Sequence, residues 1–251
     1  MKRYLLPVLV VLMLTVLLTA CGAGTEAPSQ TATPQAEDVQ TDGEMPVVVN
    51  TGEYTLYRNI FYNDGKADFA GKEAVKEGTF TVLHDAFHDT TRYYVWGYND
   101  QTKCCDWQWE LKMDDTSDLP ASGSLVKVTG TYEENGAALD KFWIIHPQIT
   151  VEKPFAARDF EIDMQAMSDT LERVQIKNII ANPDVFEGKT VCGYGRIRNE
   201  KTLEDPYYND SWSIEFSGDF TLPAFGTMVE ISGTVQSGSI ANCTLAPTTQ
   251  Y

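Results

Sequence analysis

The sequence predicts a mainly β protein in which two tandem five-stranded barrels, each with a short helical lead-in, follow a disordered tether. The first observation behind this prediction is an internal repeat. Residues 119–131 align without gaps on residues 222–234, and three further matched blocks occur in the same order along the chain. Each repeat spans about 100 residues, which is an ordinary domain size.

The second observation is the alternation of apolar and polar residues within each repeat. The first repeat contains five such segments, at 73–84, 93–98, 107–113, 125–132 and 141–151. The second contains 190–199, 212–216, 228–236 and 239–245, with a weaker segment near 206–209. Gly78 and Gly195 interrupt the first segment of each repeat, where a strand must bend to close a small barrel.

A helix is expected before the second barrel. Leu171, Val174 and Ile179 have helical spacing within residues 168–181. Pro183 is expected to end this helix.

The N-terminus has the three parts of a secretory signal. Lys2 and Arg3 precede an apolar run from residue 4 to residue 18. Residues 18–21, Leu-Thr-Ala-Cys, resemble the lipobox of bacterial lipoproteins. The resemblance implies that residues 1–20 are removed and that Cys21 carries a lipid on the extracytoplasmic face of the cell membrane. The alternative is a single transmembrane anchor, for which the apolar run is short.

Residues 21–46 form the expected tether. They are rich in Ala, Thr, Pro, Gln and acidic residues and contain no aromatic residue, so they cannot bury enough apolar surface to offset their ordering entropy. Removing Lys2 and Arg3 with the signal peptide changes the formal net charge from −17 to −19. A protein this acidic is repelled by phosphate backbones, which argues against nucleic-acid ligands.

The repeated motifs resemble the OB-fold-like domains of bacterial exported proteins. The motif x-G-K-x-V-x-x-x-G opens the first strand, and L-P-x-x-G-x-x-V-x-V-x-G-T follows later. The resemblance implies OB-fold-like domains over residues 47–153 and 160–248. The first unit also resembles uncharacterised Gram-positive lipoproteins with adjacent cysteines, here Cys104 and Cys105.

No catalytic constellation is evident in the sequence, so an enzyme is not expected. Only three histidines occur, and no serine lies in a nucleophile-elbow context. Of these histidines, His84 and His88 are expected in loops near the face that OB-folds use for ligands. The acidic cluster at 114–118 is interpreted as a solvated loop.

Cys104 and Cys105 carry the alternative function, which is zinc binding or redox chemistry. His146 is expected at the same end of the barrel and could complete a zinc site with the two thiols. A strained vicinal disulfide would instead favour a redox role. The third interpretation leaves one thiol buried and one exposed.

Cys192 and Cys243 are expected to remain two buried thiols. They fall on the first and last strands of the second barrel, which are not neighbours, so a disulfide between them is disfavoured.

Aromatic residues crowd the second and third strands of the first unit. Since neighbouring residues on a strand alternate faces, some of them must point outward. These aromatic side chains are candidates for stacking on a glycan or peptide, or else for barrel packing: Tyr94, Trp96, Trp107 and Trp109. The function expected from the sequence is therefore a lipid-anchored extracytoplasmic binding or scaffold protein.

Overall fold

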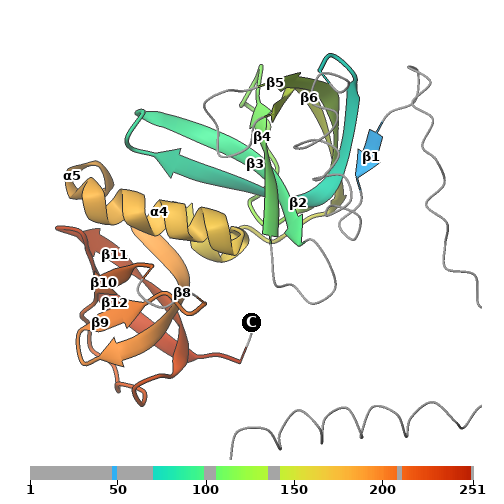
Figure 1. Cartoon of the computed structure of the whole chain (residues 1–251). Helices are drawn as coiled ribbons and strands as arrows, with labels where there is room; N and C mark the ends of the chain where they lie inside the picture. The colour runs from blue at the N-terminus through green and yellow to red at the C-terminus, as the bar shows by residue number, and fades with distance from the viewer. Residues whose placement is uncertain (1–46, 50–69, 99–105, 135–141, 208–210, 250–251) are drawn as a thin grey trace, which may run out of the picture. The chain divides into compact units, whose positions relative to one another are not determined.

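The computed structural model describes residues 47–49, 70–98, 106–134, 142–207 and 211–249 (Figure 1). All of these belong to one unit, residues 42–251. The signal peptide, the tether, Cys21, Cys104 and Cys105 lie outside the described residues, so the predictions made for them remain predictions.

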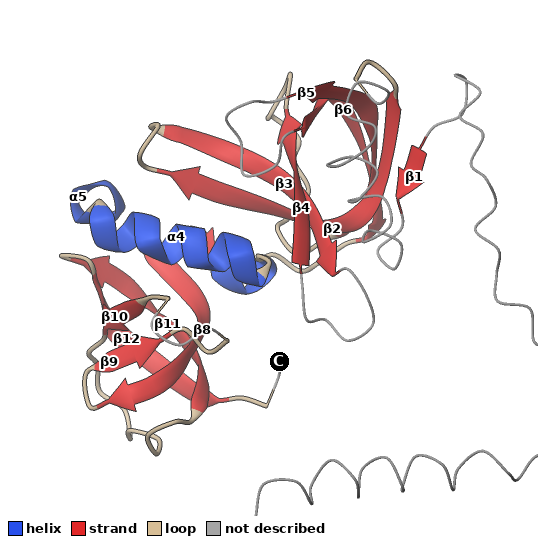
Figure 2. Cartoon of the chain, viewed as in Figure 1, coloured by secondary structure: helices blue, strands red, loops and turns tan. Residues whose placement is uncertain are grey.

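The first barrel is built from antiparallel hairpins and one parallel closure. Its sheet runs β2-β3-β4-β6-β5, and β5 pairs back with β2 to close the barrel. A short strand, β1, pairs in parallel with β2. The bounds are β1 Val47–Val49, β2 Glu73–Asp85, β3 Thr90–Tyr98, β4 Asp106–Lys112, β5 Leu125–Glu134 and β6 Phe142–Lys153 (Figure 2).

The second barrel has the same strand order but is closed by less pairing. The sheet runs β10-β9-β8-β11-β12, β7 pairs with β8, and an isolated bridge from Phe216 to Ile240 joins the two edges. The bounds are β7 Ile162–Asp163, β8 Thr190–Asn199, β9 Thr202–Glu204, β10 Ser213–Glu215, β11 Met228–Gln236 and β12 Ser239–Pro247. The predicted fold class, mainly β with two barrels, is confirmed.

The weaker strand predicted near 206–209 is absent at Pro206 and Tyr207, and residues 208–209 lie outside the described residues. The corresponding strand is β9, Thr202–Glu204, which starts directly after β8. The Asn199 side chain accepts a hydrogen bond from the Lys201 amide at 2.9 Å. This local bond closes a tight turn, so the chain reverses earlier than the composition indicated.

The repeat extends to individual backbone hydrogen bonds. The Gly71 amide donates to the Tyr132 carbonyl at 2.8 Å, and the Gly188 amide donates to the Val235 carbonyl at 2.9 Å. Both glycines have positive φ, 81° and 78°. The matched residues Val126 and Val229 are both fully buried.

A β-bulge occurs at the same place in both barrels. The register shifts between Thr129 and Thr131 in β5, and between Ser232 and Thr234 in β11. On the partner strands, His146 and Asn242 both have left-handed φ, 50° and 51°. His and Asn are among the residues that tolerate this conformation best. His146 therefore has a structural reason for its position.

Helix α4, Asp169–Ala181, follows the 3-10 turn η3, Met164–Ala166. The Ser168 hydroxyl caps it by accepting from the Leu171 amide at 3.2 Å. The predicted helix is confirmed, but Pro183 begins a second helix, α5 (Pro183–Phe186), where its missing amide costs no hydrogen bond.

The described residues form two apolar cores. One fills the first barrel and includes Phe80, Trp107 and Trp109. The other fills the second barrel and also takes in Leu83 and Tyr94, which belong to the first barrel. The two barrels therefore share apolar packing through α4.

The two bulges leave no room for a side chain at Gly130 or Gly233. A Cβ at Gly130 would lie 2.5 Å from Ile144 Cγ2, and one at Gly233 would lie 2.6 Å from the Ala241 carbonyl oxygen. We expect Gly130→Ala and Gly233→Ala each to lower the free energy of unfolding by roughly 2–4 kcal/mol, because backbone must move. Urea unfolding followed by tryptophan fluorescence measures this.

Gly195→Ala is the graded control for these two variants. Its Cβ would meet only the Leu203 side chain, at 3.2 Å, which can shift. A loss as large in Gly195→Ala as in the two bulge variants would contradict the steric explanation.

Candidate functional site

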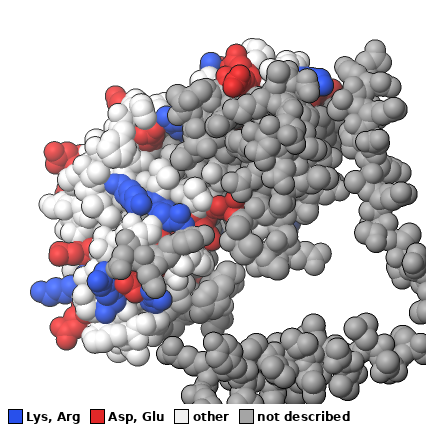
Figure 3. All heavy atoms as spheres, viewed as in Figure 1, with Lys and Arg blue, Asp and Glu red and all other residues white. Residues whose placement is uncertain are grey.

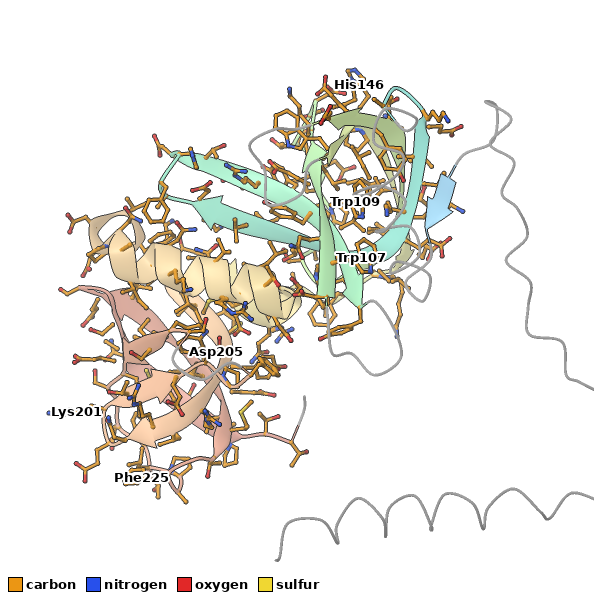
Figure 4. All side chains as sticks on the ribbon, viewed as in Figure 1. Trp107, Trp109, His146, Lys201, Asp205 and Phe225 are labelled. Carbon is orange, nitrogen blue, oxygen red and sulfur yellow. The ribbon has the colours of Figure 1, made fainter. Side chains whose placement is uncertain are left out.

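The aromatic side chains predicted to bind a ligand are enclosed by the protein. Tyr94, Trp107 and Trp109 are 1%, 1% and 2% exposed. Trp96 is half-buried, and its Nε1 donates to the Ala166 carbonyl at 2.9 Å. Figure 4 shows Trp107 and Trp109 within the first barrel. Tyr94, Trp107 and Trp109 therefore offer no open stacking surface: the two tryptophans pack inside the first barrel, and Tyr94 belongs to the apolar core of the second.

The outward-facing aromatics are covered because α4 packs on the outer side of β2 and β3. Gln175 of α4 is fully buried, and its Oε1 accepts from the His84 amide at 2.8 Å. Asp106 binds the N-terminus of α4 by accepting from the Thr170 amide at 2.6 Å and the Thr170 hydroxyl at 2.7 Å. The expectation that some of the aromatic side chains point outward holds for Tyr94 and Trp96, but the segment 164–181 packs against that face.

His146 lies at the end of the first barrel where β4 ends. Its Nδ1 is 2.9 Å from Asp114 Oδ2, beyond the C-terminal end of β4, whereas Cys105 is bonded to Asp106 at the N-terminal start of β4. A strand of this length separates its ends by roughly 20 Å. Figure 4 likewise shows His146 and Trp107 toward opposite ends of the first barrel. Cys104 and Cys105 lie outside the described residues, so the zinc site that they would form with His146 remains a prediction.

Cys192 and Cys243 are free and buried, which confirms the two-thiol prediction. The Cys192 thiol donates to Asp163 Oδ1 at 3.1 Å, and the Cys243 thiol donates to the Ile240 carbonyl at 2.9 Å. Burial raises the pKa of Cys243 to about 11 and that of Cys192 further still. Both are protonated at neutral pH and poor nucleophiles.

The hairpin between β2 and β3 is shaped by Asp85. Its Oδ1 accepts from the amides of Phe87 and His88 at 3.1 and 3.3 Å, which closes the loop 86–89. Asp89 ends the loop in a left-handed conformation, φ 49°, that Asp tolerates.

Asp85 also begins a chain of charged groups. Its Oδ2 lies 2.7 Å from His88 Nδ1 and 2.9 Å from Arg92 Nε. Arg92 also pairs with Glu110 on β4, with its Nη1 3.2 Å from Glu110 Oε2. Burial would raise the pKa of Asp85, but His88 and Arg92 outweigh it and hold that pKa below its usual value. Burial raises the pKa of Glu110, and Arg92 offsets only part of the rise.

A groove of about 390 Å³ lies beside these groups, at the rim of the first barrel. We call it the rim groove. Its lining combines the charged residues with hydroxyl, thioether and aromatic side chains: His88, Thr90, Thr91, Arg92, Tyr93, Glu110, Leu111, Lys112, Met113, Thr116 and Trp143. A cavity of this size with convergent polar groups is typical of a small-ligand site.

The rim groove depends on the parallel pairing of β4 with β6. This pairing places Trp143 opposite Glu110. Lys112 covers one face of the Trp143 ring, with its Nζ 4.3 Å from the ring centre. Tyr93 stacks on Phe80, with ring centres 6.4 Å apart. Tyr93 and Trp143 are half-buried, so each presents part of its ring to the groove.

The charged groups of the rim groove are bonded to one another, and the described residues place no metal-type cluster there. Across the part of the chain that the structure describes, no group of three His, Cys, Asp or Glu side chains is placed to hold a metal ion. Arg92 is paired with both Asp85 and Glu110.

A second set of titratable groups was not predicted from the sequence. Glu172 is 4% exposed, and its Oε1 accepts from the Tyr194 amide at 3.0 Å. Burial raises the pKa of Glu172 to about 8, the Tyr194 amide counteracts part of the rise, and Asp169 adds to it. Burial and the Asp106 charge raise the pKa of Asp169 to about 6. The sequence did contain a signal for this buried polar stripe. Polar residues recur every third position along one face of α4, at Glu172, Gln175 and Asn178.

No protein-family model and no curated protein matches this chain. The structure supports the β-barrel fold, whereas membership of an OB-fold-like lipoprotein family remains a prediction. Within the described ranges, no helix has the length and apolarity needed to span a membrane.

Glu172 should make stability depend on pH. Its pKa is raised in the folded state, so folding does not require a buried charge below about pH 4.5, where the carboxyl is protonated in both states. As pH rises from 4.5 toward 8, the unfolded state loses this proton more readily than the folded state, and the free energy of unfolding falls. We expect the free energy of unfolding of Glu172→Gln, relative to that of the original protein, to increase by roughly 2 kcal/mol when the pH is raised from 6 to 8. Urea unfolding at the two pH values measures the difference.

The exposed Glu215 supplies the matched control. Glu215→Gln removes the same kind of charge from the surface of β10 and should leave the pH dependence unchanged. An equal pH response in both variants would show that net charge, and not burial of Glu172, is responsible.

Proposed function

We propose that this chain is a lipid-anchored extracytoplasmic binding protein whose first barrel binds an uncharged glycan in the rim groove. The observation that carries the proposal is the groove itself, where partly exposed aromatic rings and hydroxyl groups adjoin a fixed set of hydrogen-bonding charges. Sugars need both kinds of contact, because one face of the ring is apolar and its edge carries hydroxyl groups.

The charges in the rim groove favour an uncharged ligand. Arg92 and Lys112 are balanced by Glu110 and by Asp85 behind it. Arg92 is held between two carboxylates, so a charged ligand would have to displace an existing ion pair. A sugar hydroxyl can accept from Arg92 or donate to Glu110 without disturbing them. A peptide is the second ligand class, and its backbone amides could use the same groups.

Nucleic acid is not part of the proposal. The net charge is −17, and the face drawn in Figure 3 shows Lys and Arg interspersed with Asp and Glu. Nucleic-acid sites instead gather basic side chains along the path of the phosphates.

The membrane location rests on the N-terminal sequence. The basic residues, the apolar run and the Leu-Thr-Ala-Cys motif support export followed by acylation of Cys21. The tether, residues 21–46, would hold the barrels away from the lipid surface.

Filling the rim groove should abolish glycan binding. Thr91 is exposed and lines the groove, so Thr91→Trp places a large ring in it without disturbing the core. We expect the full chain to bind at least one neutral oligosaccharide from a panel with a Kd on the order of 0.1–1 mM, and Thr91→Trp to weaken binding tenfold or more. Isothermal titration calorimetry measures both.

Thr150→Trp is the matched control, because Thr150 is exposed on β6 and lies outside the groove. This variant should bind like the original protein. If peptides bind and neutral glycans do not, the ligand class is wrong; if Thr91→Trp binds normally, the site is wrong.

The lipid anchor has its own test. Cys21→Ala removes the acylated residue, so the protein should shift from the membrane fraction to the soluble fraction or accumulate with its signal uncleaved. Cell fractionation with intact-mass measurement distinguishes these forms. A mature Cys21 without added lipid mass in the original protein would overturn the proposal of an anchor.

A further inference from the structure

A second cavity lies on the other side of the hairpin from the rim groove. It has a volume of about 330 Å³ and is lined by the hairpin together with α5 and the start of β8. We call it the hairpin cavity. It shares Thr90 and Thr91 with the rim groove, but its remaining lining is different. It is not used by the proposed glycan site.

One wall of the hairpin cavity is apolar. Ala86 and Phe186 contribute buried or half-buried surface, and Val185 is 52% exposed although it is aliphatic. Phe87, at the tip of the same hairpin, is 65% exposed. This wall can take an apolar chain without any rearrangement of the core.

The other wall carries hydrogen-bond acceptors. Burial lowers the pKa of His84, so the ring is neutral at pH 7, and one ring nitrogen donates to the Glu161 backbone. A neutral imidazole that donates through one nitrogen has an acceptor at the other. Asp89 adds an exposed carboxylate, and no cation is paired with it among the described residues.

The charge balance of the hairpin cavity is negative. Lys189 is the one basic residue in its described lining, and its Nζ lies 3.4 Å from Glu161 Oε1, which compensates part of its charge. Asp85 is compensated by Arg92. Asp89 is left as the uncompensated charge beside the apolar wall.

We propose that the hairpin cavity binds a primary ammonium group carried on an apolar chain. The three N–H donors of an ammonium match Asp89, the free ring nitrogen of His84 and the Thr90 hydroxyl, while the chain lies against Ala86, Val185 and Phe186. This chemistry belongs both to free aliphatic amines and to lysine side chains of a protein or peptide. The proposal does not depend on the glycan site.

The test is a titration of the full chain in detergent, followed by calorimetry or ligand-observed nuclear magnetic resonance. The probes are pentylammonium, its neutral analogue 1-pentanol, its anionic analogue pentanoate, and N-acetyl-lysine methylamide as the peptide form. We expect pentylammonium to bind with a Kd on the order of 1 mM, with pentanol and pentanoate at least tenfold weaker. Tighter binding of the lysine derivative would identify a peptide source, and equal or weaker binding would identify free amines.

Two variants locate the site. Asp89→Asn keeps a residue that tolerates left-handed φ, so the hairpin should fold normally while affinity for pentylammonium falls roughly fivefold or more. Val185→Ser removes exposed apolar surface and should weaken binding roughly threefold. Asp184→Asn removes an exposed charge from α5 outside the lining and should have no effect.

Three results would overturn the proposal. The first is the absence of saturable binding of pentylammonium, and the second is equal binding of pentanol. The third is an equal loss of affinity in Asp89→Asn and Asp184→Asn, which would reduce the effect to the general negative charge of the surface.

Discussion

The packing of α4 on the outer side of β2 and β3 is the constraint on which the rest of the structure depends. It brings Leu83 and Tyr94 of the first barrel into the apolar core of the second. The buried Gln175 side chain completes the contact by bonding both the amide and the carbonyl of His84. Because α4 covers this face of the β2–β3 hairpin, the two cavities that adjoin the hairpin lie at the rim of the barrel and beside the hairpin loop.

The repeated sequence specifies backbone geometry more strictly than side-chain chemistry. Gly130 and Gly233 occupy the same bulge, since any Cβ there would meet the partner strand. Opposite them, His146 and Asn242 share one backbone conformation although only the first is titratable. A histidine that attracts attention as a metal ligand is thus explained by its left-handed φ, a requirement that its counterpart meets with asparagine.

The strands, the repeat and α4 could be predicted from the sequence because they depend on local alternation and on glycine positions. The site could not. Alternation predicted that some aromatic side chains point outward, as Tyr94 and Trp96 do, but the sequence does not show that η3 and α4 cover them. Trp143 and Tyr93, which do line the rim groove, come together only through the parallel pairing of β6 with β4, a contact between segments distant in sequence. The polar stripe on α4 was similarly hidden, because Glu172 looks like an ordinary solvated helix residue until both neighbours of the helix are known.

The two barrels have diverged in the strands that build a ligand wall. In the first barrel, β3 and β4 contain nine and seven residues, whereas their counterparts β9 and β10 contain three each. Strands of three residues extend only roughly 10 Å and cannot carry an equivalent row of side chains. The second barrel instead supplies α4, α5 and Lys189, which enclose the hairpin of the first. The two repeats therefore differ in structure: the first has the longer strands β3 and β4, which line the rim groove, and the second packs against the hairpin of the first.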